Sequence, residues 1–222
     1  MNKKCPNCKL VDFVDVEECR RCGSAFTSVQ VRSEKTGSSI AVKILWRAGI
    51  CTVVVIGAIA AFYLSLLLTS SPLKYDEKAQ VKRAIAVLSA SGFTQEVFLL
   101  NNLTSFRGND NWLNASVEKE NAYAATNFPF EIMTIYTDFF KYPMDDVERA
   151  AILLHEAQHL KGADEKEAYE YVWKNRKKLG WTREKYWESL VWLNVRKQTR
   201  EFSPNLFVCT VNDYGDCTET DF

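Results

Sequence analysis

The sequence has no net charge and very little histidine. Its 28 lysines and arginines balance 28 aspartates and glutamates. It therefore lacks the basic excess that is typical of proteins that bind nucleic acids, and we expect no nucleic-acid partner. Only two histidines are present in 222 residues. A catalytic zinc site in this chain must therefore complete its three protein ligands with a carboxylate or a rarer group.

Charged residues are absent from residues 48–68, a run of 21 residues that is almost entirely apolar. A helix rises 1.5 Å per residue, so a run of this length crosses a hydrocarbon layer of about 30 Å. A core helix of this length would normally carry a polar face, and this run has none. The residues that precede it are too many for the n-region of a cleavable signal peptide. We predict a transmembrane helix at residues 48–68.

Seven cysteines fall into three groups along the chain. Two C-x-x-C pairs lie near the N-terminus, ten residues apart, and can present four sulfur atoms tetrahedrally around one zinc ion. Gly23 permits a tight backbone turn after the second pair. No thioredoxin-like context, which a redox C-x-x-C motif usually needs, accompanies them. We predict a small β zinc ribbon at residues 1–27, with a closed structural zinc site formed by Cys5, Cys8, Cys19 and Cys22.

The remaining cysteines and the basic residues predict the orientation. Residues 28–47 are polar with little periodicity and are predicted to be a linker. Lys43 and Arg47 lie close to the apolar run, which favours a cytoplasmic N-terminus. A thiolate zinc site also suits the reducing cytoplasm, whereas Cys209 and Cys217 are predicted to form a disulfide, which suits an oxidising compartment. We predict a single-pass membrane protein with its C-terminal domain outside the cytoplasm and a ribbon available to a cytoplasmic protein partner.

Both histidines lie in one five-residue string, His155-Glu156-Ala157-Gln158-His159. Residues four apart share one face of a helix, so both imidazoles can bind the same metal ion. A glutamate in second position is the usual general base beside a zinc-bound water. The pair Asp145 and Glu148 predicts a capping box at the start of this helix, and Gly162 predicts its end.

A second helix is predicted directly after this one, over residues 163–173. Asp164 and Glu167 match a capping box, which occupies both carboxylates. Glu165 lies on the apolar stripe of the same helix, so it is expected to face inward. We predict Glu165 as the third ligand of a catalytic zinc, with Asp164, Glu167 and Glu170 as alternatives.

With these residues the chain resembles the zincin metallopeptidases over about residues 145–173. A helix with H-E-x-x-H followed by a helix with a glutamate ligand is similar to the gluzincin branch. In that branch the substrate binds as an added strand beside a strand that precedes the zinc-binding helix. Residues 131–136 are the candidate for that strand here. Glu165 follows His159 by only six residues, and with Gly162 this spacing also resembles the metzincin pattern, with Glu165 where a third histidine would stand.

The resemblance implies a zinc-dependent enzyme that hydrolyses peptide or protein substrates. His155, His159 and Glu165 would hold the zinc, and Glu156 would take a proton from its water and pass it to the leaving amine. An oxyanion stabiliser is also needed, and the candidates that we cannot rank are Tyr136, Tyr186 and Arg196. The alternative is a non-catalytic membrane sensor or scaffold with a zinc-stabilised outer domain.

The expected fold class is α+β, with a zincin-like domain at residues 70–222. Apolar spacing predicts helices at 75–89 and 183–200. Residues 93–106 are expected to be extended or mixed in structure, and two β-like stretches are expected within 122–139.

Overall fold

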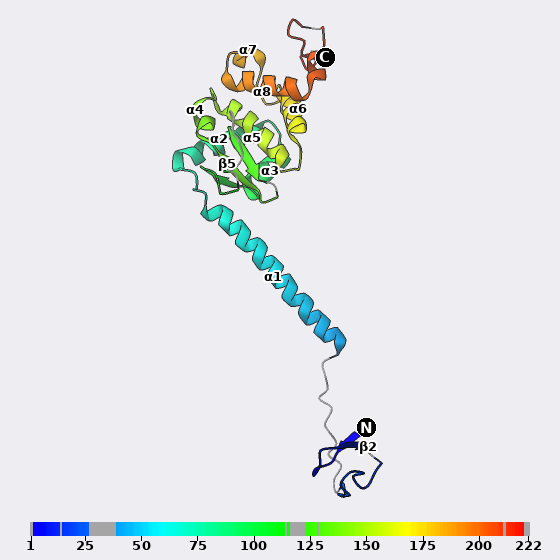
Figure 1. Cartoon of the computed structure of the whole chain (residues 1–222). Helices are drawn as coiled ribbons and strands as arrows, with labels where there is room; N and C mark the ends of the chain where they lie inside the picture. Colours follow the sequence, from blue (N-terminus) through cyan, green and yellow to red (C-terminus); the bar gives the residue numbers. More distant parts are fainter. Residues whose placement is uncertain are drawn as a thin grey trace. The chain divides into compact units, whose positions relative to one another are not determined.

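The computed structural model describes residues 2–13, 15–26, 39–113, 115, 123–127, 129–210 and 212–219. It divides into two compact units, Met1–Ile56 and Gly57–Phe222. Small sheets combined with many helices give a mixed α+β fold, as expected (Figure 1). Most of the predicted linker, residues 28–38, lies outside the described residues.

The N-terminal unit contains a two-stranded antiparallel sheet of β1 (Asn2–Lys4) and β2 (Val11–Phe13). Its buried side chains are very few. Among residues 2–26 that are described, only Cys5, Asp12 and Cys19 are buried, whereas Val11 and Phe13 are 57% and 60% exposed. An apolar core is therefore nearly absent from this unit, and the cluster of cysteines takes its place.

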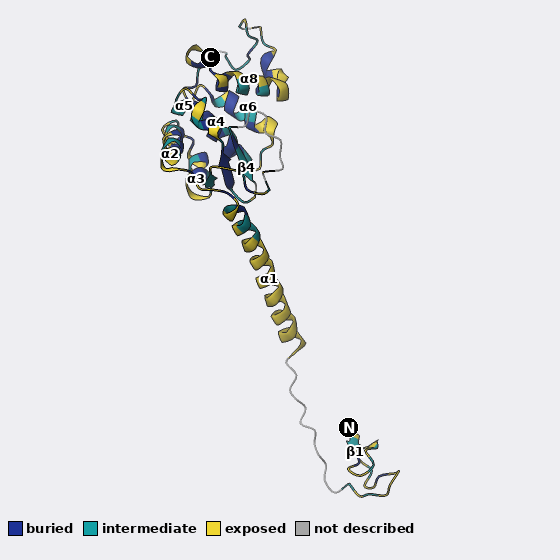
Figure 2. Ribbon diagram, turned by 60° about the vertical axis from the view of Figure 1, so that its left-hand side comes forward, coloured by how far each residue is buried: buried dark blue, intermediate teal, exposed yellow. Residues whose placement is uncertain are grey.

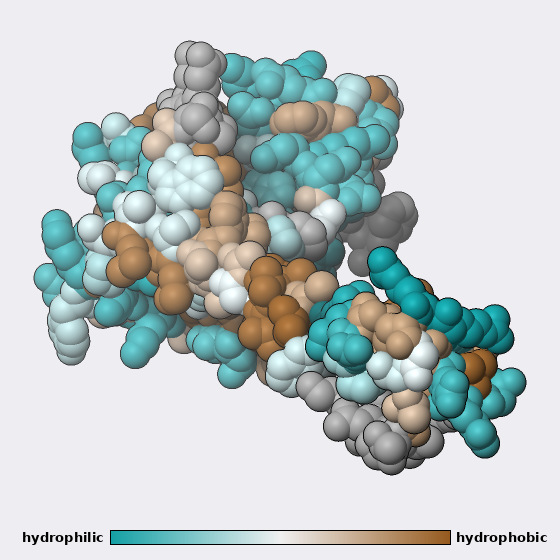
Figure 3. Space-filling view, turned by 60° about the horizontal axis from the view of Figure 1, so that its bottom comes forward, coloured by the Kyte–Doolittle hydropathy of each residue, from teal (hydrophilic) through white to brown (hydrophobic). Residues whose placement is uncertain are grey.

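Helix α1 (Ile40–Leu68) contains the whole apolar run. It begins eight residues earlier than the predicted transmembrane helix, so the last part of the predicted linker is helical. The helix is long and apolar enough to cross a membrane, and only 6% of its most apolar window is buried. Figure 2 shows α1 as largely exposed. Figure 3 shows that hydrophobic residues, in brown, reach the surface of the molecule.

The end of α1 packs against the C-terminal unit. The ring of Phe62 contacts Trp112 edge-on at 5.5 Å and Phe130 at 5.0 Å between centroids. Trp112 donates a hydrogen bond from Nε1 to the hydroxyl of Ser65, over 3.1 Å. Leu66 is fully buried. The last two turns of the helix therefore belong to the core of this unit as well as to the apolar run.

A three-stranded sheet in the order β3-β5-β4 lies in the C-terminal unit. Its strands are β3 (Ser105–Arg107), β4 (Ala124–Asn127) and β5 (Ile132–Ile135). Strand β5 is central and entirely buried, parallel to β3 and antiparallel to β4. The stretch that was the candidate for an edge strand, 131–136, is therefore the centre of the sheet. Among the described residues β4 is the edge strand that contacts α5.

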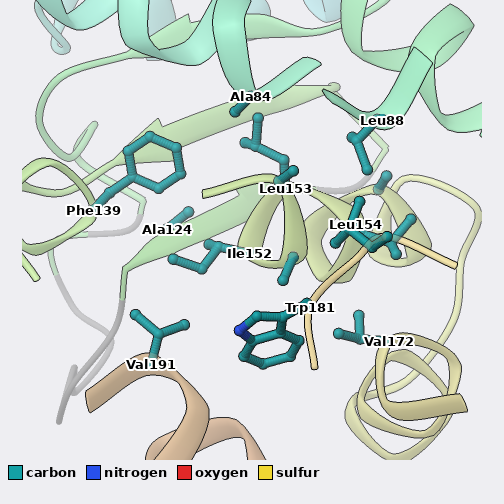
Figure 4. Packing of buried hydrophobic residues seen from close by; sticks show 14 of the residues in the cluster. Ala84, Leu88, Ala124, Phe139, Ile152, Leu153, Leu154, Val172, Trp181 and Val191 are labelled. Carbon is teal, nitrogen blue, oxygen red and sulfur yellow. The ribbon is translucent and has the colours of Figure 1, made fainter. Parts of the chain in front are cut away.

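Helix α5 (Asp146–His159) runs through the core of this unit. Five consecutive residues, from Ala150 to Leu154, are buried, because α5 is covered on one side by α2 (Tyr75–Ala90) and on the other by α6 (Glu165–Asn175). Figure 4 shows side chains of α5 between residues of α2 and the indole of Trp181. The helix that carries the H-E-x-x-H string is thus fixed by packing against α2, α6 and β4.

Two of the predicted segments differ from the structure. Residues 93–106, expected to be extended or mixed, form α3 (Thr94–Asn102) before β3, because Val97 and Leu100 pack on the core at helical spacing. The helix expected over 183–200 is divided into α7 (Arg183–Tyr186) and α8 (Leu190–Phe202). The remaining short elements are α4 (Thr137–Lys141) and the 3-10 helix η2 (Pro204–Phe207).

Candidate metal centres

The four N-terminal cysteines converge on one point. Their sulfur atoms all lie within 4.8 Å of one another, with Cys5 and Cys22 at 3.6 Å and Cys8 and Cys19 at 3.4 Å. Zn–S bonds of about 2.3 Å in a tetrahedron place neighbouring sulfur atoms about 3.7 Å apart. The four side chains could therefore hold one metal ion in a closed site, and their spacing is compatible with zinc.

The two C-x-x-C turns have the same backbone structure. The amide of Lys9 donates to the carbonyl of Cys5, and the amide of Gly23 donates in the same way to Cys19. Both Lys9 and Gly23 have positive φ angles, 63° and 70°. A second contact supports the second turn, because the Ser24 hydroxyl lies 3.3 Å from the Cys22 sulfur and lowers the pKa of that thiol to about 6. The lowered pKa favours the thiolate that a metal requires.

Helix α5 begins with only half of the predicted capping box. Asp145 accepts hydrogen bonds from the amides of Val147 and Glu148, as expected for an N-cap. The side chain of Glu148, however, is fully buried and accepts instead from the amide of Met144 and from Nε1 of Trp181. The prediction of a full capping box is wrong because Glu148 faces the core.

Helices α5 and α6 bring His155, His159 and Glu165 together. The two Nε2 atoms lie 3.1 Å apart, and the carboxylate oxygens of Glu165 lie 3.3 and 3.5 Å from them. Ligand bonds of about 2.05 Å in a tetrahedron give ligand atoms about 3.3 Å apart. These three groups could hold a metal ion, and the side chain of Glu165 is 55% exposed. Among the described residues no fourth ligand joins this group, and solvent reaches the side chain of Glu165.

Hydrogen bonding orients His159 for metal binding. Its Nδ1 lies 2.9 Å from the carbonyl oxygen of Ala163 and can donate to it, which leaves Nε2, on the side of His155 and Glu165, as the nitrogen available to a metal ion. Burial lowers the pKa of His159, but the carboxylate of Glu165 and the charge of Glu156 outweigh burial and raise it to about 9. The two histidines in turn hold the pKa of Glu165 far below its usual range. The group has the charge of a site that accepts a cation.

The three alternative ligands are engaged elsewhere. Asp164 and Glu167 form the predicted capping box, because each side chain accepts from the backbone amide of the other residue. Glu170 accepts from Lys174 and from the hydroxyl of Ser203. Of the carboxylates considered on this helix, only Glu165 faces the histidines.

Glu156 lies beside the edge strand. Its carboxylate accepts a hydrogen bond of 2.7 Å from the hydroxyl of Thr126 in β4. The residue is only 5% exposed, and its charge acts on His159, Tyr136 and Tyr169. A carboxylate that is held beside the two histidines in this way can accept a proton from a molecule bound between them.

Of the three residues suggested for an oxyanion, two lie elsewhere. Tyr186 donates to Asp145, at the opposite end of α5 from the histidines, and Arg196 lines a separate cavity. The hydroxyl of Tyr136 donates to Asp110 over 2.6 Å, and the charge of Glu156 acts on it. Tyr136 is therefore the only one of these three residues whose pKa is affected by the charge of Glu156.

Sequence reasoning missed Tyr169, which lies directly over the site. Its ring lies 4.3 Å from that of His155 and is stacked on Phe202 at 5.6 Å. Burial, together with the charges of Glu165 and Glu156, raises its pKa, so its hydroxyl keeps its proton. The signal was present, because Tyr169 follows Glu165 by four residues and must share its helix face.

A buried carboxylate, Glu96 of α3, connects the helices of this site. It accepts hydrogen bonds from Gln158 inside the H-E-x-x-H string, from Lys161 in the turn after it, and from Tyr171 of α6. Its side chain is 4% exposed. Glu96 therefore fixes the turn that sets the distance between His159 and Glu165, and nothing in the sequence around residue 96 pointed to this function.

The predicted disulfide between Cys209 and Cys217 is confirmed, with Cα atoms 5.0 Å apart. The loop that it closes is attached to α6 by Arg176, which is 1% exposed and pairs with Asp216 and Glu219. This loop forms one wall of a cavity that contains none of the metal-binding groups described above.

Comparison with known proteins finds no relative. No family model matches the chain, and neither a curated protein nor a solved structure is significantly similar to it. The resemblance to zincins therefore depends on the residues of α5 and α6 themselves. What this chain can do has to be inferred from the geometry of its two clusters of metal-binding side chains.

Proposed function

We propose that this chain is a membrane-anchored zinc metallopeptidase. The observation that carries the proposal is the convergence of His155, His159 and Glu165 at separations of 3.1, 3.3 and 3.5 Å, which suit ligands around one zinc ion. Three ligands and an open side are typical of catalytic zinc, whereas a structural site is closed by a fourth side chain. The four cysteines supply that closed type of site in the N-terminal unit.

When zinc is bound, it lowers the pKa of its water and polarises the substrate carbonyl. Glu156 then accepts the proton of the attacking water and later donates it to the leaving amine. Thr126 holds this carboxylate in place by its hydrogen bond to Oε2. The neutral hydroxyl of Tyr169, over the ring of His155, donates a hydrogen bond to the carbonyl oxygen as negative charge develops on it.

The substrate backbone pairs with β4. Among the described residues this strand pairs with β5 alone, and a peptide added beside it would bind through backbone hydrogen bonds. Thr126 links the strand directly to Glu156, which brings an added peptide strand to the catalytic carboxylate. Strand pairing recognises the backbone of a peptide more than its side chains, so we expect the enzyme to accept substrates of many different sequences.

We also propose that α1 crosses the membrane with the ribbon in the cytoplasm. The disulfide between Cys209 and Cys217 suits an oxidising compartment for the C-terminal unit, and the four thiols suit a reducing one for the ribbon. The exposed side chains of Val11 and Phe13 on β2 give the ribbon an apolar surface for a cytoplasmic protein partner.

Metal content and peptide cleavage test the proposal together. The full chain in detergent micelles should bind two zinc ions and cleave a mixed peptide library. Glu156→Gln should keep both ions and lose at least about a hundredfold in kcat, because the proton acceptor is gone. Glu165→Gln should lose one ion and all cleavage. Lys166→Gln, an exposed neighbour on α6, should change neither and serves as the matched control.

The alternative of a zinc-stabilised sensor has a different outcome. Two zinc ions in the wild type, with no cleavage of any peptide and no difference between wild type and Glu156→Gln, would reject the peptidase. Retention of both ions in Glu165→Gln would show that Glu165 is not a ligand.

A further inference from the structure

A cavity of about 540 Å³ lies in the C-terminal unit between α7, α8 and the loop closed by the disulfide. Its lining includes Arg183 of α7 and, on α8, Arg196 and Arg200. The two arginines of α8 are four residues apart and share one helix face. None of His155, Glu156, His159, Glu165 or Tyr169 lines it. The cavity is therefore distinct from the proposed catalytic site.

The three guanidinium groups have no carboxylate partner among the described residues. Two acidic residues of the lining, Asp216 and Glu219, are already paired with Arg176, and Glu219 also with Lys177. The remaining acid in the lining is Asp213, which is exposed. Among the described residues of the lining, with these pairs set aside, three positive charges face one negative charge, which is an excess of two.

The three arginines line the same cavity, and their positive charges repel one another. Burial lowers the pKa of Arg196, and the positive charges of Arg183 and Arg200 lower it further. A folded protein bears such repulsion at a cost, which an anion between the groups would relieve. Arginine suits this task because its planar fork presents several donors to an oxyanion at once.

The disulfide loop holds these side chains in position. The guanidinium of Arg183 lies over the ring of Tyr214 at 3.2 Å, and Arg196 donates from Nη2 to the carbonyl oxygen of Tyr214 over 3.3 Å. The loop itself packs closely, because a Cβ atom on Gly215 would lie 2.8 Å from the carbonyl oxygen of Phe207. Two arginines are thus preorganised, which reduces the entropy lost when a ligand binds.

We propose that this cavity is a binding site for a phosphate group, either free or as a monoester, with Arg183, Arg196 and Arg200 as its ligands. The charge excess of two matches a phosphate dianion. Trp187 and Trp192 also line the cavity, and the indole of Trp187 is partly exposed, so an aromatic wall is available to an organic part of the ligand. The site does not depend on the proposed peptidase activity.

Calorimetric titration of the full chain in detergent micelles tests this site. With inorganic phosphate we expect saturable binding with a Kd below about 1 mM at low ionic strength. Arg183→Gln and Arg200→Gln should each weaken binding about tenfold, because each removes charge-assisted hydrogen bonds. Asp213→Asn should tighten binding, because it removes the opposing charge. Phenyl phosphate should bind more tightly than phosphate if the monoester is the natural form, and equally if free phosphate is.

The matched control is Lys197→Gln, on the same helix but outside the lining of this cavity. It removes one positive charge from an exposed position and should leave Kd unchanged. No saturable binding below about 10 mM phosphate would overturn the proposal. Equal losses in Lys197→Gln and Arg200→Gln would also overturn it, since they would show a general charge effect. Asp213→Asn gives a gain of binding that an unfolded variant could not produce.

Discussion

At the scale of single residues, the two ring nitrogens of His159 have different tasks. Nδ1 is bound to the carbonyl oxygen of Ala163, and Nε2 faces His155 and Glu165. The Ala163 carbonyl belongs to the turn between α5 and α6. The same short turn therefore orients the candidate ligand His159 and places the candidate ligand Glu165 beside it. Single side chains around this turn therefore affect the metal site without binding the metal.

Replacing Tyr169 by phenylalanine tests its proposed hydrogen bond to the developing oxyanion. The ring contacts with His155 and Phe202 remain, so we expect zinc content and KM to stay close to wild type. The value of kcat should fall about a hundredfold, because a donor in the transition state is lost. Steady-state kinetics on a cleaved peptide measures kcat and KM separately.

Tyr142→Phe is the control for Tyr169→Phe, because it removes a hydroxyl that accepts a hydrogen bond from the exposed Lys141. Its kinetics should equal wild type. A change in KM with kcat unchanged in Tyr169→Phe would mean that the residue binds substrate and does not act on the reaction.

Glu96→Gln should destabilise the protein in a pH-dependent way. Burial raises the pKa of Glu96, but the hydrogen bond and charge of Lys161 and the hydrogen bond from Tyr171 lower it overall. A lowered folded pKa contributes stability above the unfolded value of about 4.3, and this stability is lost as the pH falls through the folded pKa. We expect a loss of about 1–2 kcal/mol at neutral pH.

The difference between Glu96→Gln and wild type should shrink as the pH falls below the unfolded value of about 4.3 and through the lowered folded pKa of Glu96, because the wild-type side chain then becomes neutral as well. Chemical denaturation at a series of pH values measures it. Glu77→Gln is a control of the same charge change in a carboxylate that is more exposed. A difference that grows toward low pH would show that the sign of the pKa shift is wrong.

At the scale of elements, caps decide where the site helices begin. Asp145 and Asp164 start α5 and α6, and both were predicted from sequence because an N-cap is a local signal. The break between α7 and α8 was missed. It depends on Ser189, which caps α8 through the amide of Trp192 and also donates to the buried carboxylate of Glu148 on α5. A contact over 41 residues leaves no local pattern.

Ser189→Ala should therefore cost more than the loss of a helix cap. The cap itself is worth about 1 kcal/mol, and the buried Glu148 loses one of its donors as well. We expect a decrease of about 2–3 kcal/mol in the free energy of unfolding. Thr182→Ala is the control, because Thr182 at the start of α7 makes no side-chain cap hydrogen bond. Equal effects of the two substitutions would contradict this account.

In the sheet, the sequence predicts a strand but not the order of the strands. The β-rich character of residues 132–135 was sufficient to predict a strand, and the structure has β5 there. Strand order was not predictable, because β3 pairs with β5 in parallel and β4 returns on the other side. The edge strand near Glu156 is consequently β4, which a local pattern could not distinguish from the buried strand.

At the scale of the whole molecule, the two compact units should respond differently to metal removal. Among the described residues of 2–26, the cysteines are the only buried apolar side chains, so we expect the folding of this segment to depend on a metal ion bound by them. The C-terminal unit has a large apolar core around α5. On treatment with a chelator, amide protons of residues 2–26 should lose protection from exchange, whereas those of α2 and α5 should keep it.

Hydrogen exchange followed by mass spectrometry measures this difference on the full chain. Cys5→Ser should reproduce the loss of protection in residues 2–26 without chelator and leave α5 unchanged. Simultaneous loss of protection in α5 on chelation would show that the C-terminal unit needs its metal to fold.

The contact between Trp112 and the last turns of α1 has a consequence for reach. Only residues 69–74 separate α1 from α2, and Phe62 and Ser65 are held by Trp112 below that connection. So short a connection attaches the C-terminal unit directly to the end of the apolar helix. If α1 crosses a bilayer, as proposed, the peptide bonds within reach of the proposed peptidase would be those close to the membrane surface.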